Sequence, residues 1–317
     1  MKRHQVVRVL VFAISLLLIS APLSAQRAPQ YIAISFDGSK SLQVWQETLD
    51  FAKEHKIYFT FFVSGVYFLA DENRGYYHPP RRAVGRSDIG FGGSVDEIAA
   101  RIAFVRRAFR EGHEIASHAN GHWNGASWSY DEWLSELQQF NDILLNVHEI
   151  NGLENTNQRE WRRIVQSING FRAPLLAVNS NMFQALADLG YKYDASRVAV
   201  RNYWPQRLEP GLWNFPLVSL PIGRGTVLSM DYNFYALHNR YGGNPRSSME
   251  RAYFNYFAHN YENGRAPMHI GHHFSRWKQG AYWAALSKFA VEKCNQPEVI
   301  CGTYYGLQRL MPRIQPQ

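Results

Sequence analysis

The chain has 317 residues, 46% of them hydrophobic and 15% aromatic, which is ample for a sizeable core and favours one large domain over two small ones. Its formal net charge is +8, but the positive charges are scattered rather than gathered in one block, so we expect no nucleic-acid partner. The basic balance suits an acidic cell-surface polymer, and an ordinary solvated surface explains it equally well.

The N-terminal residues have the pattern of a secretory signal peptide. Residues 1–8 are basic, residues 9–20 form an apolar run too short to span a bilayer comfortably, and residues 21–25 offer a small-residue cleavage site. Leu23 departs from the small-x-small pattern, so an uncleaved N-terminal anchor stays open as an alternative. We predict a signal peptide at 1–25, an exported protein that is periplasmic or secreted, and no stable membrane insertion after cleavage.

The chain has two cysteines, Cys294 and Cys301, seven residues apart. In an exported protein such a pair is more typical of a disulfide that closes a short loop than of a metal or redox site. We therefore predict a disulfide here.

Short apolar runs alternate with longer segments of helical periodicity along the mature chain. We predict strands at 31–36, 57–63, 113–117, 170–174, 226–230, 267–271 and 299–305, and helices at 42–55, 96–110, 130–147, 161–168, 180–189, 248–261 and 282–291. This alternation implies a parallel sheet, and over roughly 290 residues a closed or nearly closed βα barrel is the natural α/β architecture, which we assign to residues 26–317.

Two segments fit neither period. Residues 71–94 are rich in Gly, Pro, Arg and Tyr and are predicted to form a long surface loop. Its aromatic and arginine side chains would contact a sugar polymer, or the loop is an inert insertion; the sequence leaves both open. Residues 191–221 contain Pro and Trp and are predicted to be irregular.

His118 and His122 are candidate ligands for a divalent metal. They follow the strand predicted at 113–117 and are four residues apart, so a helix after Ser117 would place both imidazoles on one face. Histidines at this spacing also decorate helix surfaces, so the spacing alone does not decide between the two.

Ionisable side chains stand at the ends of five predicted strands. They are Asp37, His118, Arg172, Asp231 and His273, each at or just past the C-terminal end. In a βα barrel these ends converge on one face, where the chemistry is placed, so the pattern predicts a shared catalytic site.

At these residues the chain resembles the polysaccharide deacetylase (NodB-homology) family of carbohydrate esterases, and in places its chitin deacetylase branch. Residues 34–37 (Ile-Ser-Phe-Asp) are similar to the first motif of that family, residues 118–122 (His-Ala-Asn-Gly-His) to its metal motif, and residues 171–174 (Phe-Arg-Ala-Pro) to its Arg-x-Pro motif. Residues 265–273 and 303–311 resemble the last two barrel strands of chitin deacetylases.

The resemblance implies a distorted βα barrel with seven or eight strands that removes N-acetyl groups from N-acetylglucosamine units of a polymer. It implies that His118 and His122 bind zinc or a similar divalent ion, that Asp37 is the general base and that His273 is the general acid. Arg172 would orient and tune the base.

The resemblance also implies substrate-binding positions. The backbone N–H of Leu175 would help to hold the oxyanion, and Trp213, more than Trp204, would form an aromatic wall of the substrate groove, although core packing explains Trp213 about as well. Asp231 could hold His273 protonated, but an ordinary cap or surface aspartate is nearly as good a reading. His269 would support the site from behind or be a buried structural histidine.

The chain departs from the family pattern at two positions. Gly38 stands where the second aspartate of the first motif would bind the metal, and Ala119 replaces a Ser or Thr. Asp37 would then serve as both base and ligand; or waters or a loop carboxylate such as Asp88 would complete the shell; or the site would bind metal weakly.

Our interpretation is an exported, metal-dependent deacetylase of an N-acetylated glycan, peptidoglycan or chitin-like. The first alternative is a non-catalytic glycan-binding protein on the same barrel, and the second is a zinc-dependent esterase or amidase acting on a small molecule. The sequence does not indicate an oligomeric state.

Overall fold

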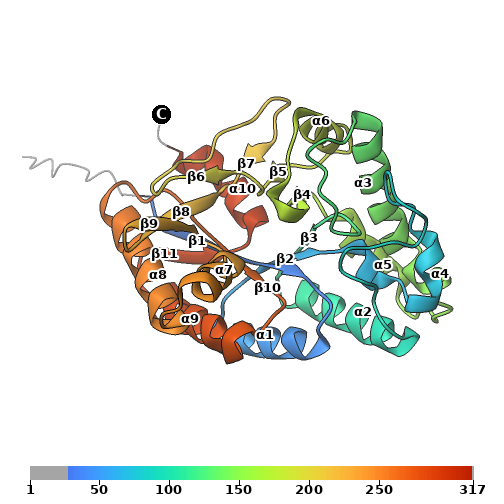
Figure 1. The fold of residues 1–317 in the computed structure, drawn as a ribbon, viewed down its shortest axis with the longest axis horizontal. Helices are drawn as coiled ribbons and strands as arrows, with labels where there is room; N and C mark the ends of the chain where they lie inside the picture. Colours follow the sequence, from blue (N-terminus) through green and yellow to red (C-terminus); the bar gives the residue numbers. More distant parts are fainter. Residues whose placement is uncertain (1–27, 316–317) are drawn as a thin grey trace, which may run out of the picture.

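A parallel β-sheet forms the centre of the computed structural model, which describes residues 28–315 (Figure 1). Seven strands are hydrogen-bonded in the order β10-β1-β2-β3-β4-β5-β7, and β11 pairs with the beginning of β1. The bounds are β1 (Gln30–Gly38), β2 (Thr60–Val63), β3 (Glu114–Ser117), β4 (Gly170–Phe171), β5 (Tyr193–Asp194), β7 (Trp213–Asn214), β10 (Met268–His273) and β11 (Val299–Gly302). The strands form a half-barrel, which confirms the predicted distorted α/β barrel.

Helices surround the sheet (Figure 1). They are α1 (Leu42–His55), α2 (Val95–Arg110), α3 (Tyr130–Leu145), α4 (Val147–Ile150), α5 (Gln158–Gln166), α6 (Ser180–Asp188), α7 (Asp231–Tyr241), α8 (Pro245–Glu262), α9 (Trp277–Cys294) and α10 (Tyr304–Ile314). Three short 3-10 turns are η1 (Gly65–Phe68), η2 (Asp71–Tyr76) and η3 (Pro174–Leu176).

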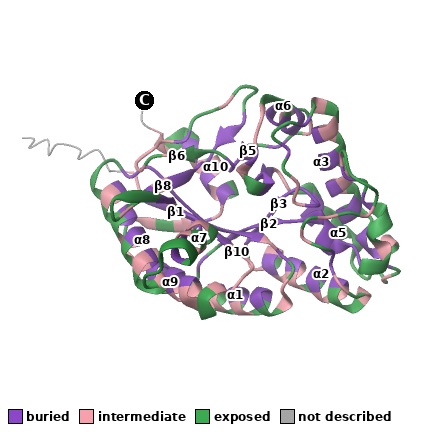
Figure 2. Cartoon of the chain, in the orientation of Figure 1, coloured by how far each residue is buried: buried purple, intermediate pink, exposed green. Residues whose placement is uncertain are grey.

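Nearly every residue of β1, β2 and β3 is buried, and the longer helices around them combine buried with exposed residues (Figure 2). This explains why the strands appear in the sequence as continuous apolar runs rather than as alternating patterns. Aromatic side chains fill much of the space between sheet and helices: the Trp45 ring lies 4.5 Å from that of Phe61 and 4.8 Å from that of Phe274. The core therefore fixes the strand ends on which the site depends.

One predicted barrel strand lies elsewhere. Residues 226–230 were expected in the main sheet, but β9 (Gly225–Leu228) pairs antiparallel with β8 (Leu217–Ile222) in a separate sheet that β6 (Val198–Ala199) completes. The prediction was wrong for residues 225–228, because β8 lies in the segment that we expected to be irregular, so the hairpin partner of β9 was not visible. The end of the predicted strand does reach the main sheet, where Met230 forms a parallel bridge with Gly271 of β10.

The C-terminal segment also differs from the prediction. We expected a strand at 299–305 and a strand-like continuation beyond it, but β11 ends at Gly302 and α10 begins at Tyr304. Thr303 caps this helix, because its hydroxyl accepts a hydrogen bond from the Gly306 N–H at 3.0 Å. The chain therefore changes from strand to helix within two residues.

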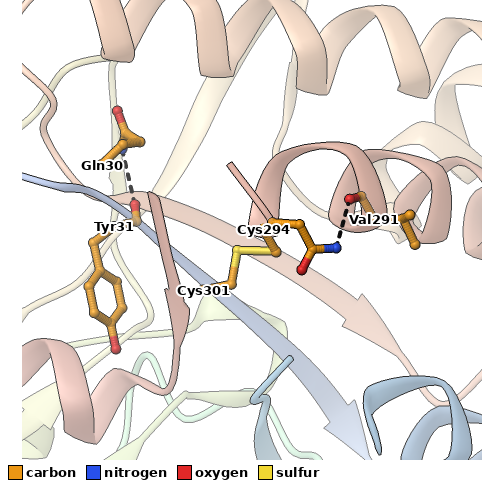
Figure 3. The surroundings of a disulfide bond; sticks show 6 residues. Gln30, Tyr31, Val291, Cys294 and Cys301 are labelled. Atoms are coloured by element: carbon orange, nitrogen blue, oxygen red, sulfur yellow. Dashed lines mark hydrogen bonds between the residues drawn. A yellow bond between two sulfur atoms is a disulfide. The ribbon is translucent and has the colours of Figure 1, made fainter. Parts of the chain in front are cut away.

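A disulfide joins Cys294 at the end of α9 to Cys301 in β11 (Figure 3), which confirms the predicted pairing. No helix within residues 28–315 is long and apolar enough to cross a membrane. The predicted signal peptide at 1–25 lies outside the described residues.

Replacing both cysteines with serine should lower the free energy of unfolding by about 2–3 kcal/mol, because the bond closes a loop with a sequence separation of only 7. Chemical denaturation of the oxidised protein and of the Cys294→Ser/Cys301→Ser variant would measure the difference. Reduced wild-type protein is the control and should match the variant. Equal stability of the oxidised protein and the variant would contradict the expectation.

Candidate functional site

The strand register brings the predicted site residues to one end of the sheet. Asp37 in β1 lies opposite His273 in β10. Arg172 comes directly after β4, and its backbone N–H donates to the carbonyl of Ser117, the residue before His118, at 3.0 Å. Parallel strands end at the same edge of a sheet, so these side chains meet although they are far apart in the sequence.

Asp37 and His273 line one pocket, while Arg172 is fully buried behind Asp37. The walls of this pocket include Asp37, His118, His122, His273, Leu175 and Tyr232. The structure thus brings together both candidate metal ligands, the candidate base, the candidate acid and the residue whose N–H we expect to hold the oxyanion.

Asp37, which lines the pocket, forms a buried ion pair with Arg172. Arg172 Nη1 donates to Asp37 Oδ1 at 2.7 Å and to the Ser35 hydroxyl at 2.8 Å. Burial opposes the charge on Arg172, but the Asp37 carboxylate and its hydrogen bond, together with Tyr304 and Tyr193, raise the pKa of Arg172. Arg172 therefore stays charged and holds one carboxylate oxygen of Asp37 in place.

A second buried pair joins Asp231, the first residue of α7, to His273. Asp231 Oδ1 lies 2.7 Å from His273 Nδ1, and Oδ2 accepts from the His273 backbone N–H at 2.9 Å. A carboxylate accepts only, so Nδ1 carries a proton and Nε2 is the ring nitrogen left for chemistry. Burial alone would lower the pKa of His273, but the Asp231 carboxylate and its hydrogen bond raise it. The predicted Asp231–His273 contact is present.

His118 and His122 lie on a loop, not on a helix, which was one arrangement that their spacing would suit. Ala119 has φ 54° and His122 has φ 61°, both in the left-handed region, so the chain turns tightly between the two rings. The ring centroids are 5.2 Å apart. A close approach that we expected from helical periodicity is therefore produced by a turn.

The protonation of this histidine pair suits metal binding. His118 Nδ1 lies 2.8 Å from the Arg172 carbonyl oxygen, which can only accept, so Nδ1 carries the proton and Nε2 keeps its lone pair. Burial lowers the pKa of His118 to about 3 and also lowers that of His122, with the charge on His273 adding to the second shift. Both rings are neutral, the form that binds a metal.

The number of ligands, however, is small. Within residues 28–315, no group of three or more His, Cys, Asp or Glu side chains is arranged to hold a metal ion. The two imidazoles fit as ligands, but a catalytic zinc usually has three protein ligands. Asp88 lies on the exposed loop beside this pair, where its backbone N–H donates to the Gly121 carbonyl at 2.9 Å.

Residues 24–193 match the family described as polysaccharide deacetylase. The chain belongs to the polysaccharide deacetylase family. A comparison with curated protein sequences found no match.

Several solved structures are similar to this family member. A proposed polysaccharide deacetylase from Mycobacterium smegmatis is 16% identical, with a TM-score of 0.59 over 94% of this chain and 96% of that one. A peptidoglycan deacetylase from Bacillus subtilis is 14% identical, with a TM-score of 0.48 over 90% and 93%. A CE4 family pseudoenzyme from Bacillus anthracis is 9% identical, with a TM-score of 0.48 over 88% and 66%.

In this family member, the position of the missing second aspartate has an unusual backbone conformation. Gly38 has φ 108° and Ser39 has φ 124°, values that L-residues rarely adopt. The Ser39 carbonyl accepts from Trp45 Nε1 and from Nε of the fully buried Arg101, each at 3.0 Å. The turn after Asp37 is therefore held by two side chains of the core, and glycine suits it.

The structure does not place Trp213 in the pocket. Its side chain is only 4% exposed, lies parallel to the Phe215 ring and has the Arg207 guanidinium over it, so the predicted groove wall is part of the core. Sequence reasoning missed Tyr232 and Trp277, which line the pocket with ring centroids 6.0 Å and 5.2 Å from that of His273. The sequence signal that could have found them is their position: Tyr232 directly follows Asp231, and Trp277 comes four residues after His273.

His269 does not reach the pocket walls and supports no catalytic contact. It is buried, its ring lies parallel to that of Tyr304 at 5.4 Å, and neither ring nitrogen has a hydrogen-bond partner among the described residues. Burial lowers its pKa to about 3, so the ring is neutral. We therefore interpret His269 as a packing residue of the barrel interior.

Replacing Gly38 with alanine or aspartate should lower the free energy of unfolding by about 1–3 kcal/mol, because either residue must adopt a disfavoured φ. A Cβ at this position would meet only Phe274 Cβ, at 3.8 Å, so backbone strain rather than a clash is the cause. Gly75→Ala is the control, since its φ is not positive and its Cβ would meet nothing within 4 Å. Denaturation showing Gly38→Ala as stable as Gly75→Ala would contradict the assignment.

Proposed function

We propose that this protein is an exported, metal-dependent hydrolase that removes the N-acetyl group from N-acetylglucosamine units of a polysaccharide, peptidoglycan or chitin-like. The observation that carries the proposal is that Asp37 and His273 line one pocket and that each is paired with a different buried partner, Asp37 with Arg172 and His273 with Asp231. Membership of the polysaccharide deacetylase family supports the same reaction.

The two pairs suit an acid and a base. Arg172 is ion-paired with Asp37 and occupies its Oδ1, so the other carboxylate oxygen is the one available to accept a proton from an attacking water. Asp231 favours the charged form of His273, whose Nε2 can then give a proton to the leaving amine. The hydrolysis needs one group that accepts a proton and another that donates one, and the two pairs place such groups in the same site.

His118 and His122 would hold the divalent ion, for which we expect zinc. An ion bound there would supply Lewis acidity toward the acyl carbonyl, which an amide needs because it is a poor electrophile. The backbone N–H of Leu175, a residue of the pocket wall with φ 56°, is our candidate for holding the oxyanion.

Substrate and location follow from other features. The Tyr232 side chain is 51% exposed and adjoins Trp277, so the pocket offers a partly open aromatic surface to the apolar face of a sugar ring.

The disulfide between Cys294 and Cys301 is typical of an oxidising compartment, which supports export.

A second candidate function is glycan binding without turnover on the same barrel. It is favoured by one observation, the presence of two rather than three protein ligands. The two functions differ in whether the pocket releases acetate.

Acetate release by the purified mature protein from chitin oligosaccharides and from peptidoglycan tests the proposal. We expect release that stops on chelation and returns with zinc. Asp37→Asn should lower kcat by about 10²–10⁴-fold because the general base is lost, while leaving glycan binding nearly unchanged. Glycan retention without release from either polymer would favour the binding protein, and full activity of Asp37→Asn would show that the base is wrong.

Asp231→Asn tests the assignment of the acid. His273 must be protonated to act, so activity falls as pH rises through its pKa, and Asp231 is what raises that pKa. The variant should therefore lose activity at lower pH than the wild type on the alkaline side of the kcat/KM profile. An unmoved alkaline limb would exclude His273 as the group that titrates there.

A further inference from the structure

The loop that carries the two candidate ligands needs support from outside itself. Residues 118–122 have no regular secondary structure, and Ala119 and His122 both have left-handed backbones. Ala119 has no polar side chain that could hold the turn. Such a conformation persists only when its surroundings determine it.

Two backbone N–H groups between the histidines bind a buried pair of side chains. The Asn120 N–H donates to Glu136 Oε1 at 2.9 Å, and the Gly121 N–H donates to the Tyr77 hydroxyl at 3.2 Å. Tyr77 in turn donates to Glu136 Oε2 at 2.9 Å. Tyr77 is fully buried and Glu136 is 1% exposed, so solvent hardly competes for these contacts.

Packing adds to the hydrogen bonds. A Cβ at Gly121 would lie 2.6 Å from Tyr77 Cε1, so the tyrosine ring lies directly against the loop backbone. The Asn120 side-chain amide donates to the Glu136 carbonyl at 2.7 Å, and the Ala119 carbonyl accepts from the Gly65 N–H at 2.8 Å. Every residue between the two histidines therefore contacts the structure behind the loop.

We infer that Tyr77 and Glu136 are positioning residues, which hold residues 118–122 so that His118 and His122 present both imidazoles to one ion. The pair connects segments distant in sequence: Tyr77 follows η2, and Glu136 lies in α3. This inference rests on the proposed metal-dependent function. With only two protein ligands to hold the ion, their relative orientation matters more than in a site with three.

The chain offers a matched control. The Tyr193 hydroxyl donates to Glu114 Oε1 at 2.8 Å, and both residues are buried. Burial raises the pKa of Glu114 and of Glu136 to about 7, so the two pairs are alike in chemistry. Glu114, however, begins β3, at the end of the strand away from His118.

The experiment compares Tyr77→Phe with Tyr193→Phe. Calorimetric titration of zinc into the chelated proteins should show a tenfold to hundredfold loss of affinity in Tyr77→Phe, as is typical when a group that orients ligands is removed, and wild-type affinity in Tyr193→Phe. Hydrogen exchange of the metal-free proteins gives a second readout. The amides of Asn120 and Gly121 should exchange faster in Tyr77→Phe only.

The outcomes separate the inference from the proposed function. Equal zinc affinity in the two variants, with measurable wild-type affinity, would overturn the inference and leave the function standing. If wild type and His118→Ala both fail to bind zinc, the metal-dependent function is wrong, and exchange alone decides whether the pair orders the loop. Unchanged exchange at Asn120 and Gly121 in Tyr77→Phe would then overturn it.

Discussion

The buried ion pair of Arg172 and Asp37 is the interaction on which the rest of the site depends. Two charges removed from water are costly unless their hydrogen bonds are satisfied, and losing one partner of such a pair costs about 3–5 kcal/mol. The guanidinium meets this requirement with the Ala195 carbonyl at 3.0 Å, the Tyr304 hydroxyl at 3.2 Å and the Phe62 ring 4.4 Å away. Several elements of the barrel therefore have to assemble before Asp37 is correctly placed.

The C-terminal helix α10 is one of those elements, so the unexpected change from strand to helix contributes to the site. At its start, the Tyr304 N–H donates to the Thr60 hydroxyl at 3.0 Å and the Tyr305 N–H to Glu114 Oε2 at 2.8 Å. These bonds anchor the first turn of α10 to β2 and β3, so the Tyr304 hydroxyl is fixed beside Arg172. The placement of Tyr304 therefore depends on a helix beginning at this residue.

The sequence was sufficient for the parts of the site that depend on strand ends. Asp37 and His273 were predictable because a buried parallel strand is a continuous apolar run whose end is easy to locate. The structure of residues 118–122 was not predictable, because identical spacing arises from a helix and from a tight turn. Tyr77 and Glu136 carry no motif at all: their contact spans 59 residues and forms only when the loop and α3 pack together. The buried position of Trp213 was not predictable for a similar reason. Short strands in an irregular segment show no alternation from which the buried face could be recognised.

Charge balance explains what Gly38 means for the site. Asp37 is paired with Arg172 and Asp231 with His273, so each of these two carboxylates already has a partner, and burial lowers the pKa of both metal-candidate histidines. A divalent cation bound by His118 and His122 would therefore find no unpaired carboxylate in Asp37 or Asp231. Asp88, on the exposed loop, belongs to neither pair, and its negative charge favours a higher pKa of His122. Burial is the larger effect, so the pKa of that ring is lowered. The ion would therefore be held by ligand geometry more than by charge, which makes the support of the 118–122 loop decisive.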